Sequence, residues 1–312
     1  MMQGKLPQLR LTSVKVLARK LHTTPAVLTH MCQSVESCDE HGNPISYYHK
    51  DRIDKKGKKR PTDTPIGKFR EINDRINLLL QQVELPDYVK GGVRGESPVT
   101  NAMCHAGKPL VVRIDIKSFF PNIKQHRVFL MFVNEQGCSE PVALILTRLT
   151  TLHGAVPQGF PTSTSVATLV SLPLTKRLSN FAMSCNVCFT QYVDDFIFSG
   201  PTSFGDRVGK LLEIIREEGF EVNPNKVDLM IRDHEQVATG VRVNSKALDV
   251  PKKMITDIRK KLWDLSADVA QGQLLTDKEL RSLHGKIDWI TRFNHGAGKF
   301  YRRRLFKIVR GW

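Results

Sequence analysis

Three aspartates are the residues of this chain best suited to do chemistry. Asp194 and Asp195 stand together where two β-prone apolar runs meet at a tight turn, and Asp115 lies near the end of a β-branched run over residues 110–121, before two phenylalanines. A carboxylate at the end of a buried strand is costly unless it is paired or binds a cation. Phosphoryl transfer with two metal ions roughly 3.5–4 Å apart needs a few such carboxylates. The alternative for an isolated Asp-Asp pair is a solvated turn.

A glycine between two prolines separates these acidic segments. Gly159 follows Pro157 and Gln158 and precedes Pro161. This arrangement predicts a turn at which the backbone can approach a ligand closely, with a helix beginning near Ser163. The alternative is a plain loop before a core helix.

The elements that must position these residues can be predicted coarsely. Strands are expected within residues 110–121, over residues 188–191 and over residues 196–200, and a helical pair over residues 11–35, with Ser13 and Thr24 as candidate caps. Residues 50–60 form a basic stretch that is typical of a flexible segment. Three basic helices are expected over residues 252–269, 277–292 and 297–309, with breaks at Gln271-Gly272 and at residues 294–296.

The charge of the chain indicates a polyanionic partner. The 47 Lys and Arg exceed the 31 Asp and Glu by 16 over 312 residues. Nucleic acid fits this balance, and no uninterrupted apolar run or leader-like start favours a membrane. The six cysteines suit a reducing cytosol, with Cys185 and Cys188 expected to be buried structural thiols rather than zinc ligands.

The order of these motifs resembles the palm of reverse transcriptases. Asp115, then Pro157-Gln158-Gly159, then Tyr192-Val193-Asp194-Asp195 carry the resemblance. Residues 219–226 are similar to the Gly-Phe…Asn…Lys motif that follows this palm hairpin. Two further segments are similar to retron reverse transcriptases of bacteria: Asn101-Ala102-Met103-Cys104-His105, and Ala238-Thr239-Gly240, where Ala replaces the first Val of the retron motif. The resemblance covers about residues 50–310.

The resemblance implies an α+β right-hand polymerase with fingers, a palm built on an antiparallel sheet, and a helical thumb. Its boundaries would be an N-terminal helical extension over residues 1–49, fingers and palm over residues 50–248, and a basic thumb over residues 249–312. In the fingers, a strand is expected over residues 65–72 and a helix over residues 77–83.

The resemblance also implies a metal centre for nucleotidyl transfer. Two Mg²⁺ ions, with Mn²⁺ as a substitute, would be held by Asp115, Asp194 and Asp195, with the carbonyl of Ile116 as a further ligand. Lys226 matches the family lysine near the pyrophosphate and would neutralise or protonate the leaving group. The alternative for Lys226 is a surface lysine after a turn.

Four residues would contact the deoxynucleoside triphosphate. Arg70, on the expected fingers strand, would bind phosphate oxygens in a bidentate way. Phe120 would stack under the deoxyribose and leave no room for a ribose 2′-hydroxyl. The alternative is that Phe120 is core and Phe119 faces the site, since only one of the two can point there. Gln158 and Gly159 would lie beside the nucleotide and the template.

RNA contacts are expected in two places. Asn101 and His105 would contact a structured non-coding RNA that serves as template and primer, or would simply tie down a loop. Arg302, Arg303 and Arg304 would grip the RNA–DNA duplex through its phosphates, or would form a solvated charged face.

The function implied is retron-type reverse transcription in the bacterial cytoplasm. Retron enzymes prime DNA from a guanosine 2′-hydroxyl of their own RNA, so the DNA product (msDNA) stays attached through a 2′,5′ branch. An effector protein and antiphage defence would complete the setting. The alternatives are another bacterial reverse transcriptase, from a group II intron, a diversity-generating element or a defence system, and a non-catalytic RNA-binding palm. No maturase or endonuclease segment follows Trp312, which disfavours a full intron protein.

Overall fold

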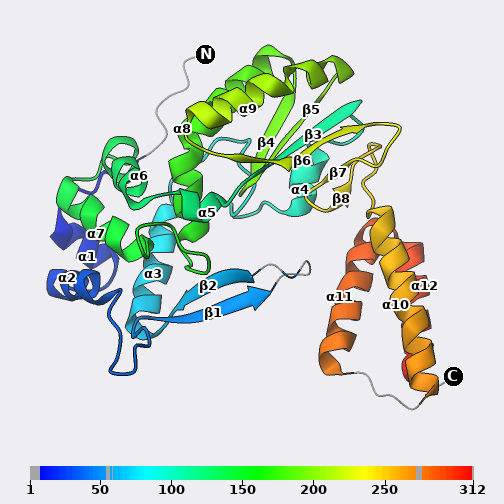
Figure 1. The fold of residues 1–312 in the computed structure, drawn as a ribbon, viewed down its shortest axis with the longest axis horizontal. Coiled ribbons are helices and arrows are strands. Elements are labelled where there is room, and N and C mark those ends of the chain that lie inside the picture. The colour runs from blue at the N-terminus through cyan, green and yellow to red at the C-terminus, as the bar shows by residue number, and fades with distance from the viewer. Residues whose placement is uncertain (1–7, 54–56, 58, 272–275, 311–312) are drawn as a thin grey trace.

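A four-stranded antiparallel sheet, in the order β4-β5-β3-β6, forms the centre of the fold (Figure 1). The computed structural model describes residues 8–53, 57, 59–271 and 276–310. The strands are β3 (Leu110–Ile116), β4 (Cys188–Tyr192), β5 (Asp195–Gly200) and β6 (Val222–Ile231). Their β-branched and aromatic residues suit a pleated, buried surface. The predicted α+β class with an antiparallel palm sheet is confirmed.

The two faces of the sheet bury different layers, because alternate residues of a strand point to opposite faces. Val112 and Ile114 face the main core, which they share with α8 (Ser163–Ser184) and α9 (Val208–Glu217). Val111 faces a smaller core made with α4 (Pro98–Met103) and with the hairpin of β7 (Val237–Ala238) and β8 (Val241–Arg242).

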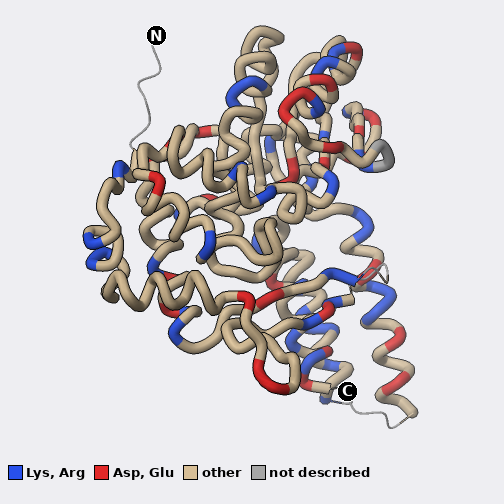
Figure 2. Tube along the Cα trace, turned by 60° about the vertical axis from the view of Figure 1, so that its left-hand side comes forward, with Lys and Arg blue, Asp and Glu red and all other residues tan. Residues whose placement is uncertain are grey.

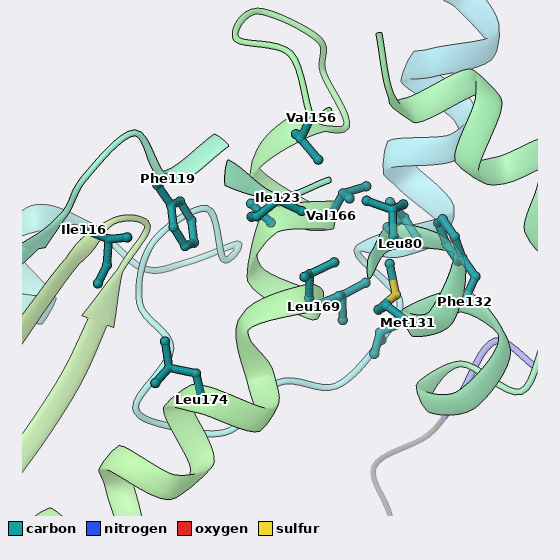
Figure 3. Packing of buried hydrophobic residues seen from close by; sticks show 14 of the residues in the cluster. Leu80, Ile116, Phe119, Ile123, Met131, Phe132, Val156, Val166, Leu169 and Leu174 are labelled. Atoms are coloured by element: carbon teal, nitrogen blue, oxygen red, sulfur yellow. The ribbon is translucent and has the colours of Figure 1, made fainter. Parts of the chain in front are cut away.

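The main core continues beneath the end of β3. Ile116, Phe119 and Leu174 lie in it beside Ile123 and Val166 (Figure 3). The short elements around this core are α5 (Phe119–Asn122), α6 (Gln125–Leu130), η1 (Met131–Glu135), α7 (Glu140–Thr150) and η2 (Thr202–Arg207). The end of β3, the strand that carries Asp115, is therefore packed against the main core.

The fingers hairpin differs from the prediction for residues 50–60. β1 (Tyr47–Ile53) pairs with β2 (Lys59–Pro65) in an antiparallel ladder, so most of the expected flexible stretch is strand. Residues 54–56 and 58 lie outside the described residues. The charged side chains of this ladder are largely exposed, and the period-two pattern that would announce a half-buried strand is therefore weak.

The strand expected over residues 65–72 is wrong beyond Pro65. Helix α3 (Gly67–Leu80) begins just beyond it. The helix expected over residues 77–83 is its last turn up to Leu80, and residues 81–83 lie past its end. The physical reason is the spacing of Phe69, Ile72, Ile76 and Leu79, all buried, which recur every three or four residues.

The N-terminal helices support the rest of the molecule rather than forming a separate layer. α1 (Val14–Lys20) and α2 (Pro25–Ser34) bury Leu17, Leu21 and Leu28 in the main core. The Thr24 side chain accepts a hydrogen bond from the Val27 amide, as a cap should, whereas Ser13 makes no side-chain cap.

Three helices form the C-terminal module: α10 (Lys252–Ala270), α11 (Asp277–Phe293) and α12 (His295–Arg310). The helix predictions are confirmed to within two residues, and Gly272 lies outside the described residues. The helices enclose their own core, which includes Leu262, Leu283 and Tyr301. Basic and acidic residues are interleaved along their surfaces (Figure 2).

The expectations about a membrane-spanning segment and about the cysteines can be compared with the structure. Over the described ranges, no helix is both long enough and apolar enough to span a bilayer. All six cysteines are free thiols. Cys185 and Cys188 are half-buried rather than buried as expected, because they flank a turn at the start of β4.

Candidate active site

The sheet brings the three aspartates together at one end. β3 and β5 pair so that Asp115 lies opposite Asp195, and Asp194 occupies the turn that joins β4 to β5. The Ile116 amide donates a hydrogen bond to the Asp194 carbonyl at 3.1 Å, which fastens the turn to the end of β3. Carboxylates 79 positions apart in the chain thus become neighbours through strand register.

The turn itself has an unusual backbone. Tyr192 pairs with Asp195, so Val193 and Asp194 form a two-residue hairpin loop. Val193 has a φ of 59°, a left-handed value that β-branched residues rarely adopt. The surrounding structure must therefore hold this conformation.

Burial and nearby negative charge make Asp194 and Asp195 harder to ionise than a free aspartate. Burial, followed by the Asp194 and Asp115 charges, raises the pKa of Asp195 to about 6 against the opposing effect of Arg113. The pKa of Asp194 is also raised, mainly by burial. Arg113 is itself held by Asp228, at 2.5 Å between Nη2 and Oδ2. The site therefore gains stability from any cation placed among the carboxylates.

Lys226 supplies one such cation. Its Nζ lies 2.5 Å from Asp115 Oδ1, with both side chains partly buried. This contact with Asp115 differs from the alternative, a surface lysine with no connection to the site. A direct role of Lys226 in catalysis stays a prediction.

The donor set suits hard divalent cations, although the carboxylates are not already converged on one. Within the described part of the chain, no three His, Cys, Asp or Glu side chains form a ready metal-binding group. Asp115 is instead bonded to Lys226, so it must exchange the ammonium for a metal ion. All-oxygen ligands fit Mg²⁺ or Mn²⁺, and Mg²⁺ keeps several of its waters. The Ile116 carbonyl as a further ligand stays a prediction.

The two phenylalanines after β3 differ in exposure. Phe119 is 3% exposed and packs on Phe220, with ring centroids 5.9 Å apart. Phe120 is only partly buried. Ser118 precedes them with a φ of 48°, which turns the chain sharply at the strand end. Of the two rings, Phe120 is the more exposed, and its contact with a sugar stays a prediction.

The Gln158-Gly159 turn touches the fingers hairpin through its backbone. The Asp63 amide donates to the Gln158 carbonyl at 2.7 Å. Gly159 has a φ of 113°, and a methyl group there would lie 2.5 Å from the Asp63 carbonyl oxygen. Only glycine fits this approach. The turn is therefore docked against β2 by backbone contacts.

Arg70 does not lie where the sequence predicted. It is on helix α3 rather than on a strand, and its Nε donates to Asp74 at 2.8 Å on an exposed face. Sequence reasoning missed two other arginines that act on the carboxylates. The charge of Arg60, on β2, lowers the pKa of Asp194, and Arg113 lowers that of Asp195. Arg113 stands two positions before Asp115, so strand alternation was a usable signal.

The expectation that Asn101 and His105 contact RNA is corrected. Both side chains are fully buried. His105 Nδ1 lies 2.8 Å from Ser199 Oγ and its Nε2 lies 2.7 Å from Thr190 Oγ1, and burial lowers its pKa to about 3. Asn101 Nδ2 donates to the Thr239 hydroxyl at 3.3 Å. These residues bind α4 to β4, β5 and the β7–β8 hairpin, which is the alternative role of tying down a loop.

The arginines of α12 remain candidates for phosphate contact. Arg302, Arg303 and Arg304 are exposed, and Arg302 pairs with Asp288 of α11 at 2.5 Å. In Figure 1, α11 lies on the side of the module that faces the fingers hairpin. Their role in gripping a duplex stays a prediction.

A three-aspartate site on an antiparallel palm, flanked by a hairpin and a helical module, is the arrangement of a nucleic-acid polymerase. The family profile of "Reverse transcriptase (RNA-dependent DNA polymerase)" matches residues 49–243. That match covers more than half of the chain, and the chain belongs to the reverse transcriptase family.

Curated relatives of this chain are retron enzymes. The retron Mx162 reverse transcriptase of Myxococcus xanthus is 28% identical over 285 residues, covering 81% of this chain and 59% of the relative. The retron Mx65 reverse transcriptase of the same organism is 34% identical over 190 residues, covering 54% of this chain and 44% of the relative. The chain thus spans about half the length of these proteins.

Among solved structures, telomerase from Candida albicans, in complex with a fragment of telomeric RNA, shares the fold. The TM-score is 0.50 at 13% identity, covering 85% of this chain and 56% of that chain.

Proposed function

We propose that this chain is an RNA-directed DNA polymerase of retron type, acting in the bacterial cytoplasm. The observation that carries the proposal is the pairing of Asp115 with Asp195 beside Asp194, in a chain whose curated relatives are retron reverse transcriptases. The substrates are deoxynucleoside triphosphates, and the template-primer is a structured non-coding RNA that becomes part of an RNA–DNA duplex.

The carboxylates are the residues that would hold two Mg²⁺ ions. Bound ions would make the primer hydroxyl a better nucleophile and offset charge on the phosphates. The protein's own part is to keep Asp194 and Asp195 rigid at a strand end and partly shielded from water. Because their pKa values are raised, they hold a dication more favourably than they hold bare charge.

Positive side chains receive the triphosphate. Lys226 already directs its ammonium into the site, and a triphosphate is a denser anion than Asp115. Lys226 then donates to the phosphate oxygens and supports departure of pyrophosphate. Arg60, on the hairpin docked against Gln158, adds its charge on the same side, a role that we assign to it in place of Arg70.

Phe120 selects the sugar. Its partly buried ring would lie under the deoxyribose and would clash with a ribose 2′-hydroxyl, which would also find no hydrogen-bond partner on a phenyl ring.

The retron product is the most specific part of the proposal. The DNA would begin at a guanosine 2′-hydroxyl of the RNA and remain joined to it as msDNA, and an effector protein would use this product in antiphage defence. The support is the retron identity of the relatives.

The test is to co-express the protein with its flanking locus and to extract nucleic acid beside an Asp194→Asn/Asp195→Asn control. A discrete DNA whose RNA remnant is resolved by debranching enzyme, and which the control lacks, is the expected result. Unbranched DNA would leave the polymerase and remove the retron subclass. Bound RNA with no incorporation by either protein, even with magnesium and a generic RNA template–DNA primer, would favour a non-catalytic palm.

A further inference from the structure

Residues 88–91 run along the outer edge of β4, directly behind the turn that carries Asp194. The Gln191 amide donates to the Tyr88 carbonyl at 2.8 Å, and the Lys90 and Gly91 amides donate to the Gln191 carbonyl at 2.8 and 3.2 Å. Val89 forms a parallel bridge with Gln191. The segment is thus attached to the edge of the palm sheet by one bridge and these three backbone hydrogen bonds.

Gly91 brings this segment into contact with the backbone of the turn. A methyl group at Gly91 would lie 2.3 Å from the Val193 amide nitrogen and 2.8 Å from the Tyr192 carbonyl carbon. Both are backbone atoms, so no side-chain rotation can relieve the clash. A residue larger than glycine must therefore displace either the segment or the turn.

Gln191 supports the same turn from inside the protein. Its side chain is fully buried, and its Nε2 donates to Ser171 Oγ at 3.0 Å and to the Val193 carbonyl at 3.2 Å. Val193 has the left-handed φ of 59°. A strained backbone conformation of this kind costs about 1–3 kcal/mol of conformational free energy, and it persists only where the surrounding contacts hold it in place.

We propose that Gly91 and Gln191 are positioning residues for polymerisation. Gly91 packs against the backbone of the turn, and the Gln191 side chain donates a hydrogen bond to it. Together they hold the turn in place, so that Asp194 and Asp195 stay in register with Asp115. The inference rests on the proposed polymerase function. A misplacement of reacting groups by about 1 Å can cost about 100-fold in rate.

The first test compares Gly91→Ala with Gly209→Ala, whose added methyl group on α9 meets nothing within 4 Å. On an RNA template–DNA primer with magnesium, Gly91→Ala should lower kcat about 100-fold and leave KM for the template-primer within about twofold, since remote surfaces bind the duplex. Gly209→Ala should match the wild type. A merely structural role would lower thermal stability and the fraction of active enzyme, measured as the burst amplitude in a single-turnover experiment, while the remaining active enzyme kept the wild-type rate constant.

The second readout needs neither metal nor activity. Hydrogen–deuterium exchange of metal-free Gly91→Ala should accelerate at residues 188–196 and at the Ile116 amide, which is bonded to the turn, and stay unchanged in the thumb helices. Should Gly91→Ala fail to fold, Gln191→Met keeps the buried volume and removes both side-chain hydrogen bonds, and it should give the same kcat loss and local exchange.

The outcomes separate the two proposals. Wild-type kcat together with wild-type exchange in Gly91→Ala would overturn the positioning role. If neither the wild type nor Gly209→Ala incorporates nucleotide, the polymerase function is refuted. The exchange data would still decide whether residues 88–91 hold the turn in place.

Discussion

Replacing Asp195 with Asn should stabilise the metal-free protein while abolishing nucleotide incorporation. Burial and the Asp194 charge raise the pKa of Asp195 from 3.8 to about 6. A shift of about two pKa units corresponds to about 3 kcal/mol of unfavourable free energy for the ionised form. Asn has the same shape without the charge. Since Asp195 keeps some contact with solvent, we expect a gain in unfolding free energy of about 1–3 kcal/mol near neutral pH.

The gain should depend on pH in a defined direction. Between pH 4 and about pH 6 the native protein keeps a proton on Asp195 that the unfolded chain has lost, so wild-type stability falls as the pH rises. The Asn variant lacks this loss. The difference between the two proteins should be about a third of its full value at about pH 4.5 and nearly complete above about pH 7. His105 titrates with the opposite sign, but it is common to both proteins and cancels.

Thermal unfolding in EDTA at both pH values measures this difference. The variant should unfold about 2–6 °C higher than the wild type at pH 7.5. Asp206→Asn, at an exposed position, is the matched control and should change nothing. An Asp195→Asn protein that is no more stable than the wild type, or equally stabilised at both pH values, would refute the electrostatic reasoning. Added Mg²⁺ should stabilise the wild type more than the variant.

Three further predictions concern single residues. Phe120→Ala should raise ribonucleotide incorporation relative to deoxynucleotide incorporation by at least about tenfold in single-nucleotide assays, and an unchanged ratio would place the sugar elsewhere. Lys226→Met should slow incorporation by about 10–100-fold with little change in KM for the template-primer, whereas a wild-type rate would make the lysine incidental. His105→Ala should cost about 2–4 kcal/mol of unfolding free energy, because it leaves a cavity and two unpaired hydroxyls, and urea unfolding would measure it. In the wild type, the lowered pKa of His105 should make stability fall as the pH drops below about 6.5, and this dependence should weaken in His105→Ala.

The catalytic strands could be predicted from the sequence because local pattern and tertiary role agree there. The run that ends at Asp115 is buried on both faces, and the two runs around Asp194 meet at a tight turn, so strand identity follows from composition. The exact pairing of Asp115 with Asp195 needs the register, which no local pattern contains.

The errors arose where tertiary contacts decide. Asn101 and His105 are polar and suggest a surface, but their partners Thr190, Ser199 and Thr239 lie 85 or more positions away. The fingers hairpin lacks apolar alternation because its ladder is mostly exposed. Gly91 carries no motif, and its role appears only when the turn is seen against it.

The contact between β2 and the Gln158-Gly159 turn has a consequence for how such proteins diverge. It is made by backbone atoms, the Asp63 amide and the Gln158 carbonyl, and it needs no particular side chain from either residue. Only Gly159 is sterically fixed. Mutations can therefore accumulate along the hairpin and change its charge while the Gln158-Gly159 turn keeps its place. The charge of the hairpin surface and the position of the turn are thus free to evolve independently.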